Sequence, residues 1–111
     1  MPFNGTEGKA IDPHLAGDWT HAFQNSVPGD ATKAVFFGRE ILETILAQNG
    51  CEGIRFYFGL SSGSIQLNGA MQLVAVGADN QENDQLGDGQ IVADEGMSCP
   101  PSCSQSNVLY N

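Results

Sequence analysis

The segment from Ala34 to Leu60, AVFFGREILETILAQNGCEGIRFYFGL, constrains the fold more than any other part of the chain. Its first part repeats apolar residues at helical spacing, and its last part alternates apolar and polar residues as a strand does. Between the two patterns, Gln48-Asn49-Gly50 forms a good helix stop. The segment therefore predicts a helix followed by a strand that packs against it.

The predicted helix begins after Asp30, a good N-cap residue, and continues for about five turns to Gln48. One wide arc of its surface is apolar and the opposite side is polar. The apolar arc consists of Ala34, Phe37, Gly38, Ile41, Leu42 and Ile45. Phe36 falls on the polar side with Arg39, so either the N-terminal arm covers it or it marks a contact surface for a partner.

Strand patterns follow the helix. Gly53–Leu60 alternates, so Ile54, Phe56, Phe58 and Leu60 should face the helix while Arg55 and Tyr57 point the other way. Further strands are expected at Ile65–Leu67, Met71–Val76 and Gln90–Ala93, with a hairpin turn at Asn68-Gly69 and an acidic loop over Ala78–Gly89. Consecutive strands joined by short turns should pair antiparallel.

The two ends of the chain lack clear periodicity. Asp12 and Pro13 could cap and open a helical turn, but Gly17 argues against a long helix there. Leu15, Trp19 and Phe23 are spaced by four and should lie on the core. The tail is rich in Pro, Ser and Asn, and its residues 108–110 could dock on the core.

These patterns together predict an α+β fold. It should contain one long helix packed on a small antiparallel sheet of three to four strands, with an irregular N-terminal arm and C-terminal tail. A chain of 111 residues predicts a single domain, divided into an arm (1–30), a helix–sheet core (31–93) and a Cys/Pro tail (94–111).

Charge limits the classes of partner. Thirteen Asp and Glu against four Lys and Arg give a net charge of −9, which argues against binding to nucleic acid or to a membrane surface. A basic partner or a cation is electrostatically more plausible. The sequence has neither a long apolar run nor a basic, apolar leader, so we expect a cytoplasmic protein with reduced cysteines.

Cys51, Cys99 and Cys103 are the most chemically interesting set. The segment Cys99-Pro100-Pro101-Ser102-Cys103 can close a disulfide only by turning sharply, for instance through a cis Pro101. The alternatives are buried or idle thiols, one disulfide that involves the tail, a zinc site completed by His14 or His21, and a catalytic thiol. The spacings match no ordinary zinc module, so zinc is an alternative rather than an expected cofactor.

No coherent catalytic set is present, and we expect no enzyme. Gly59-Leu60-Ser61-Ser62-Gly63 matches the G-x-S-x-G motif, but a strand rather than a helix should follow it and both histidines precede it. His14 and His21 are best interpreted as structural histidines. Phe36, Arg39, Arg55 and Tyr57 are the candidate interaction residues, with ion pairing to the many carboxylates as the simpler interpretation of the two arginines.

Three motifs, F-F-G-R-E-I at 36–41, G-C-E-G-I-R-F-Y-F-G at 50–59 and C-P-P-S-C at 99–103, resemble a group of small bacterial proteins. The similarity runs from about residue 34 to the C-terminus, although Phe56 and Phe58 and an extra segment at 61–70 depart from the group's pattern. The resemblance implies no activity. It does imply that the three cysteines, Arg39 and Arg55 are features of the group, which favours a tail held by cysteine chemistry.

The sequence thus favours a non-enzymatic interaction or assembly protein that binds a protein partner or itself. The alternative is a thiolate metal-binding or redox module built on Cys51, Cys99 and Cys103.

Overall fold

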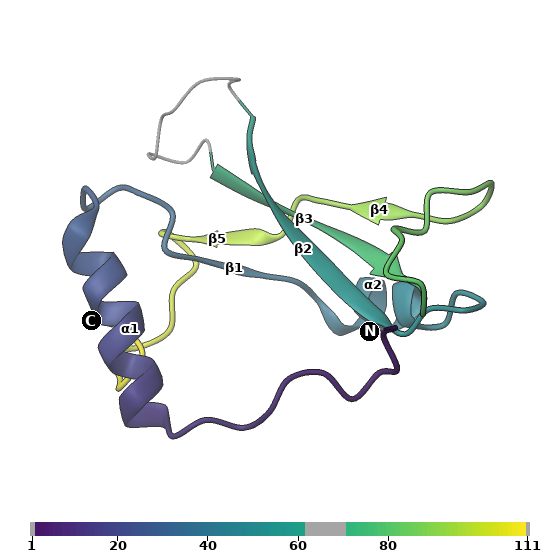
Figure 1. Cartoon of the computed structure of the whole chain (residues 1–111). Helices are drawn as coiled ribbons and strands as arrows, with labels where there is room; N and C mark the ends of the chain where they lie inside the picture. The colour runs from purple at the N-terminus through teal and green to yellow at the C-terminus, as the bar shows by residue number, and fades with distance from the viewer. Residues whose placement is uncertain (1, 62–70, 111) are drawn as a thin grey trace. The chain divides into compact units, whose positions relative to one another are not determined.

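The computed structural model describes residues 2–61 and 71–110, and it has an α+β fold with two helices and two small antiparallel sheets (Figure 1). The helices are α1 (Pro13–Ser26) and α2 (Arg39–Leu46), and the strands are β1 (Ala34–Phe36), β2 (Gly53–Leu60), β3 (Met71–Ala78), β4 (Val92–Ala93) and β5 (Met97–Cys99). The strand predicted at Ile65–Leu67 and the turn predicted at Asn68-Gly69 lie outside the described residues.

The described residues form two compact units, which we treat separately. The sheet unit holds residues 2–8, 37–59 and 72–96, and therefore α2 and most of the three-stranded sheet. The ribbon unit holds residues 9–36, 60–61, 71 and 97–110, and therefore α1 and the two-stranded ribbon of β1 and β5.

In the sheet unit, β3 lies between β2 and β4. The pairing of β3 with β4 is antiparallel and places Ala75 opposite Ala93. Ile45 of α2 is fully buried against these two alanines, and the partly buried hydrophobic residues around this centre are Phe37, Ile41, Cys51, Ile54 and Ile91. The core thus sits where α2 crosses the sheet, as the apolar arc and the alternating strand predicted.

The prediction of one long helix is wrong. Ala34–Phe36 instead forms β1, which pairs antiparallel with β5, and α2 begins only at Arg39 with Gly38 as its N-cap residue. Three consecutive residues gain backbone hydrogen bonds from a distant strand, and this overrides their helical spacing. The end of α2 agrees with the prediction, because Ala47 and Gln48 donate to helix carbonyls and Gly50 takes a positive φ of 80°.

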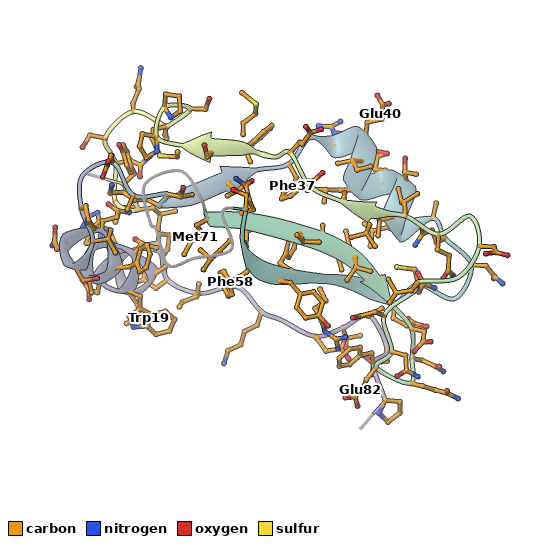
Figure 2. All side chains as sticks on the ribbon, turned by 90° about the horizontal axis from the view of Figure 1, so that it is seen from above. Trp19, Phe37, Glu40, Phe58, Met71 and Glu82 are labelled. Carbon is orange, nitrogen blue, oxygen red and sulfur yellow. A yellow bond between two sulfur atoms is a disulfide. The ribbon has the colours of Figure 1, made fainter. Side chains whose placement is uncertain are left out.

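A short α2 leaves the far end of β2 uncovered. Phe56 packs against Phe37 at 5.9 Å between ring centroids, but Phe58, two residues further along the same face, is 81% exposed (Figure 2). The prediction that Phe58 and Leu60 face a covering helix is therefore wrong. A helix of five turns would have reached them, whereas α2 has eight residues.

A buried pair of glutamines ties the sheet unit together. Gln85 is 5% exposed, and its Nε2 donates to the carbonyl of Asn49 at 2.9 Å. Its Oε1 accepts from Gln48 Nε2 at 3.0 Å, while Gln48 Oε1 accepts from the amide of Ile91 at 2.8 Å. The end of α2, the acidic loop and the approach to β4 are thus joined by side chains whose polar atoms are satisfied.

Gly77 makes this network possible, because a Cβ atom there would lie 2.5 Å from Gln85 Oε1 and 3.0 Å from both Cys51 Sγ and Gln48 Nε2. We predict that Gly77→Ala lowers the free energy of unfolding by about 1–3 kcal/mol, since the surrounding side chains are held by hydrogen bonds and cannot yield freely. Urea denaturation would measure this loss.

Gly53→Ala is the matched control for this prediction. Gly53 opens β2, and no atom lies within 4 Å of the position that a Cβ would occupy, so its replacement should leave the urea midpoint nearly unchanged. Equal midpoints for the two variants would contradict the tight fit at Gly77.

In the ribbon unit, α1 begins as its cap predicted and continues further than expected. Asp12 accepts a hydrogen bond from the amide of Leu15 at 3.3 Å, and Pro13 occupies the first turn. The helix then passes through Gly17, where any side chain would collide with the backbone carbonyl of Val108. Gly17 is therefore the contact point of the tail and not the break that the sequence indicated.

None of the described helices has both the length and the apolar character that crossing a bilayer requires.

Candidate functional site

An exposed apolar stripe runs along α1. Leu15, Trp19 and Phe23 follow one another at intervals of four residues, so they lie on one side of the helix. All three are exposed, and 63% of the surface of Trp19 is accessible (Figure 2). The prediction that these side chains lie on the core is therefore wrong. A tryptophan and a phenylalanine on a two-turn apolar stripe are typical of a contact surface.

The tail explains why α1 turns this stripe outward. Thr20 Oγ1 and Gln24 Nε2 both donate to the carbonyl of Leu109, at 2.8 and 2.9 Å, and Gly17 meets Val108. The tail holds its own shape around Asn107, whose Oδ1 accepts from the amides of residues 109 and 110. The polar side of α1 thus binds the tail, which leaves the apolar side outward.

Phe36 and Met97 add a second exposed apolar feature to the ribbon unit. They are directly opposite in the register of β1 and β5, and they are 66% and 57% exposed. The sequence placed Phe36 on a polar helix face, and the structure places it on a strand. Its exposure is nevertheless what the interpretation as a contact residue requires.

A disulfide joins Cys99 to Cys103, with their Cα atoms 4.7 Å apart. The intervening segment turns sharply, and the peptide bonds before Pro100 and Pro101 are both cis. Cys99 is the last residue of β5 and is buried, whereas Cys103 is only partly buried. Both half-cystines line a cavity of about 460 Å³ whose walls are mostly apolar, formed chiefly by Val35, Phe36, Met97, Leu109 and Tyr110.

Cys51 is a free thiol in the sheet unit, and its Sγ donates to the carbonyl of Gly53 at 3.2 Å. Because Cys99 and Cys103 are bonded to each other, neither offers a thiolate to zinc in this state. In the part of the chain that the structure describes, no group of three His, Cys, Asp or Glu side chains is placed to hold a metal ion. The zinc alternative thus remains a prediction for a reduced form of the protein.

His14 and His21 line one cavity of about 410 Å³ in the ribbon unit, together with Asp12, Asp18 and Val108. Within the described residues, His21 Nε2 is buried and has no hydrogen-bond partner. Arg55 and Tyr57 belong to the sheet unit, so neither unit by itself contains them together with the two histidines.

The clearest polar cluster is on β2 of the sheet unit, where Asp84 receives hydrogen bonds at both carboxylate oxygens. Arg55 Nη1 donates to Oδ1 at 2.5 Å, and the Tyr57 hydroxyl donates to Oδ2 at 2.6 Å. The guanidinium also donates to the carbonyl of Glu82 at 3.2 Å and lies 5.4 Å from the ring centroid of Phe3. The predicted ion pairing of Arg55 is confirmed.

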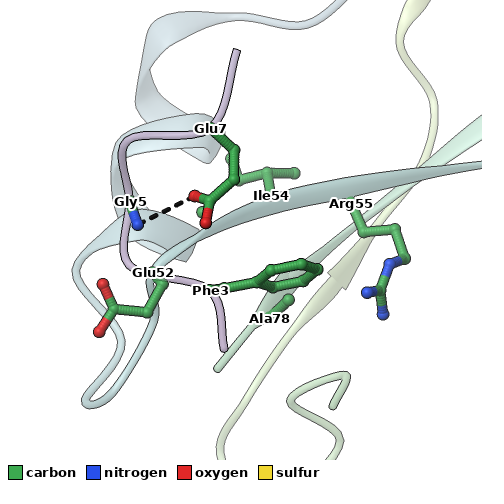
Figure 3. Close-up of a pocket in the computed structure, with 8 residues that line it drawn as sticks. Phe3, Gly5, Glu7, Glu52, Ile54, Arg55 and Ala78 are labelled. Carbon is green, nitrogen blue, oxygen red and sulfur yellow. Dashed lines mark hydrogen bonds between the residues drawn. The ribbon is translucent and has the colours of Figure 1, made fainter. Parts of the chain in front are cut away.

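Phe3 belongs to an N-terminal segment that runs along this site. Its amide donates to the carbonyl of Asn80 at 3.0 Å, and its side chain lines a cavity of about 340 Å³ together with Glu52 and Arg55 (Figure 3). Glu7 accepts from the amides of Asn4 and Gly5 and so fixes the turn that follows. The aromatic ring of the N-terminal segment thus forms part of the wall of this cavity.

Hydrogen bonding shifts the ionisation of this cluster. The hydrogen bond from Tyr57, with that from Arg55, lowers the pKa of the Asp84 carboxyl below its ordinary value. The same bond to Asp84 raises the pKa of the Tyr57 phenol, and Asp84 likewise raises the pKa of Arg55.

Arg39, by contrast, is exposed, and its Nε lies 4.0 Å from Oε1 of Glu43 one helical turn away. This is a surface ion pair that contributes little to stability.

The sequence did not indicate two features of these sites. Asp84 was one carboxylate among many in the acidic loop, and only the bridge of Ala78 with Asp84 brings it beside β2 and β3. The outward stripe of α1 was visible as a spacing, but the side that it faces depends on where the tail docks.

Comparison of the chain with protein-family models, curated proteins and solved structures gave no match.

We predict a pH-dependent loss of stability in Asp84→Asn. A carboxyl whose pKa is lowered by folding stabilises the native state above its unfolded pKa of about 3.9 and loses this contribution as the pH falls through the lower folded value. Asp84→Asn should therefore have a lower urea midpoint than the parent at pH 7, and the two midpoints should converge below about pH 4.

Tyr57 provides a second test of the cluster. In a Tyr110→Phe background, the absorbance of the remaining tyrosinate should report a raised pKa for Tyr57, and adding Asp84→Asn should lower it toward the ordinary value of about 10. An unchanged pKa of Tyr57 in this variant would mean that Asp84 does not accept a hydrogen bond from the phenol in solution.

Proposed function

We propose that this protein is a non-enzymatic assembly protein that forms a symmetric dimer through the apolar stripe of α1. The observation that carries the proposal is the outward exposure of Leu15, Trp19 and Phe23 on a helix whose opposite side is occupied by the tail. The occupant of the stripe is a second copy of the same chain.

Charge distribution supports a second copy. The sheet unit carries ten carboxylates and two arginines, which gives it −8 of the total charge of −9. The ribbon unit carries three carboxylates and two lysines, so its formal charge is only −1. Two copies repel each other strongly if their sheet units approach, and least if their ribbon units do. A strongly basic partner would in contrast be attracted to the sheet unit rather than to the stripe.

The spacing of the stripe suits a two-fold contact. If two α1 helices pack antiparallel, Leu15 of one copy lies beside Phe23 of the other and the two Trp19 side chains meet near the axis. The result is an isologous interface with aromatic residues at its centre, where residues with a large effect on binding concentrate. Asp18 borders the stripe and remains in contact with water.

We predict that the protein dimerises and that Trp19→Ala raises the dissociation constant of the dimer by tenfold or more, because truncating a central aromatic residue costs about 2 kcal/mol. Sedimentation equilibrium would measure the constant. In the parent, Trp19 is the single tryptophan, so its emission should shift to shorter wavelength as the concentration rises.

Leu86→Ala is the matched control, because Leu86 is an equally exposed apolar residue in the acidic sheet unit. It should leave the dissociation constant unchanged. A parent that stays monomeric at millimolar concentration would overturn the proposal, and so would an equal effect of the two variants.

Salt gives an independent prediction. Because each copy carries −9, added NaCl screens the repulsion between copies and should strengthen the dimer between 20 and 300 mM, concentrations at which the Debye length falls from about 20 Å to about 6 Å. Dimerisation that weakens with salt would instead indicate an interface between oppositely charged groups.

A further inference from the structure

We propose that the Cys99–Cys103 disulfide is a thiol–disulfide exchange site for paired cysteine thiols carried on an apolar peptide segment. The proposal is independent of the dimer and rests on three features of the ribbon unit: the disulfide lines a cavity, its two sulfur atoms differ in burial, and the surrounding chain is anchored elsewhere.

The cavity sets the class of substrate. Its volume of about 460 Å³ admits several side chains, and its walls are largely the apolar groups of Val35, Phe36, Met97 and Leu109. A segment of apolar residues around a cysteine would be desolvated there at little cost. Lys33 also lines the cavity, but its ammonium group donates to the carbonyls of Pro28, Gly29 and Ala31, so the apolar walls set the preference for substrate.

The difference in burial sets the direction of attack. Cys99 is buried at the end of β5, while Cys103 is only partly buried. An incoming thiolate therefore reaches Cys103 Sγ, forms a mixed disulfide with it, and expels Cys99 as a thiolate that takes up a proton. The second thiol of the substrate then attacks its own sulfur atom in the mixed disulfide and releases Cys103 as a thiol.

These two exchange steps are balanced in atoms and electrons. The substrate dithiol loses two electrons and two protons and becomes a disulfide, and the protein disulfide gains them and becomes a dithiol. Each chain thus oxidises one dithiol. The exchange needs no third cysteine of the protein, because the disulfide and the substrate dithiol supply all four sulfur atoms.

The anchoring of the chain on both sides allows the bond to open without release of the tail. The amide of Lys33 donates to the carbonyl of Cys99 at 2.7 Å, which holds the buried half-cystine in the ribbon. On the other side, Leu109 is bound by Thr20 and Gln24 of α1. A disulfide whose only role was to fix the tail would duplicate these bonds.

The first experiment maps the attacked sulfur atom in the full chain carrying Cys51→Ala. Benzyl mercaptan, an apolar monothiol, is added to the oxidised protein, the reaction is stopped with acid, and the mixed disulfide is located by mass spectrometry. We expect at least a tenfold excess of adduct at Cys103 over Cys99. Equal adducts, or an excess at Cys99, would overturn the proposal.

The second experiment measures the contribution of the cavity. The rate constant for benzyl mercaptan is divided by that for the anionic thiol glutathione, both in the protein and in a synthetic disulfide peptide of residues 97–104. We expect the ratio in the protein to exceed the ratio in the peptide by tenfold or more. Comparing the two ratios cancels the intrinsic reactivity of the thiols. A ratio equal to that of the peptide would show that the cavity selects nothing and would overturn the assigned substrate class.

A pair of matched variants completes the test. Met97→Glu places a negative charge on the wall of the cavity at an exposed position, and it should slow exchange with benzyl mercaptan several-fold. Leu86→Glu adds the same charge in the sheet unit and should leave the rate nearly unchanged. Equal rates for both variants would contradict the assignment of the cavity as the exchange site.

A last experiment uses a peptide with two cysteines among apolar residues. Each protein chain should oxidise it to form one disulfide, and a yield near zero would contradict the proposal.

Discussion

The backbone pairing of β1 with β5 is the interaction on which most of this structure depends. It takes Ala34–Phe36 out of the helical pattern that continues into α2 and gives these residues strand hydrogen bonds instead. As a consequence α2 is short, the far end of β2 lacks a covering helix, and Phe36 stands opposite Met97 on an exposed ribbon. The same pairing fixes Cys99 at the end of a strand, where it bonds to Cys103 across a tight turn.

Each unit is stabilised by a different kind of contact. The sheet unit has a small apolar centre at Ile45 and, beside it, the satisfied glutamine network around Gly77, which together join α2 to the sheet. The ribbon unit relies on polar bonds between α1 and the tail and on the disulfide. Charge is also divided unevenly, since most carboxylates belong to the sheet unit. Exposed aromatic residues occur in both units, as Trp19 in the ribbon unit and Phe58 in the sheet unit.

Local signals in the sequence predicted several elements correctly. The alternation over Gly53–Leu60 matches β2 at both ends, the Gln48-Asn49-Gly50 stop ends α2, and Asp12 with Pro13 opens α1. The polar cluster on β2 was harder to predict from the sequence. Arg55 and Tyr57 were recognised as outward residues, yet their partner Asp84 comes from a loop 27 residues away from Tyr57, and no local pattern singles out one carboxylate of that loop.

The sequence by itself determined the α+β class, the main strands and the strongly acidic charge, because periodicity, caps and composition act over a few residues or over the whole chain. Tertiary structure alone decided which three residues leave the helix, which side of α1 faces outward, and which two of the three cysteines are bonded. Each of these choices depends on a segment distant in sequence, since β5 and the tail compete for groups that local propensity assigns differently.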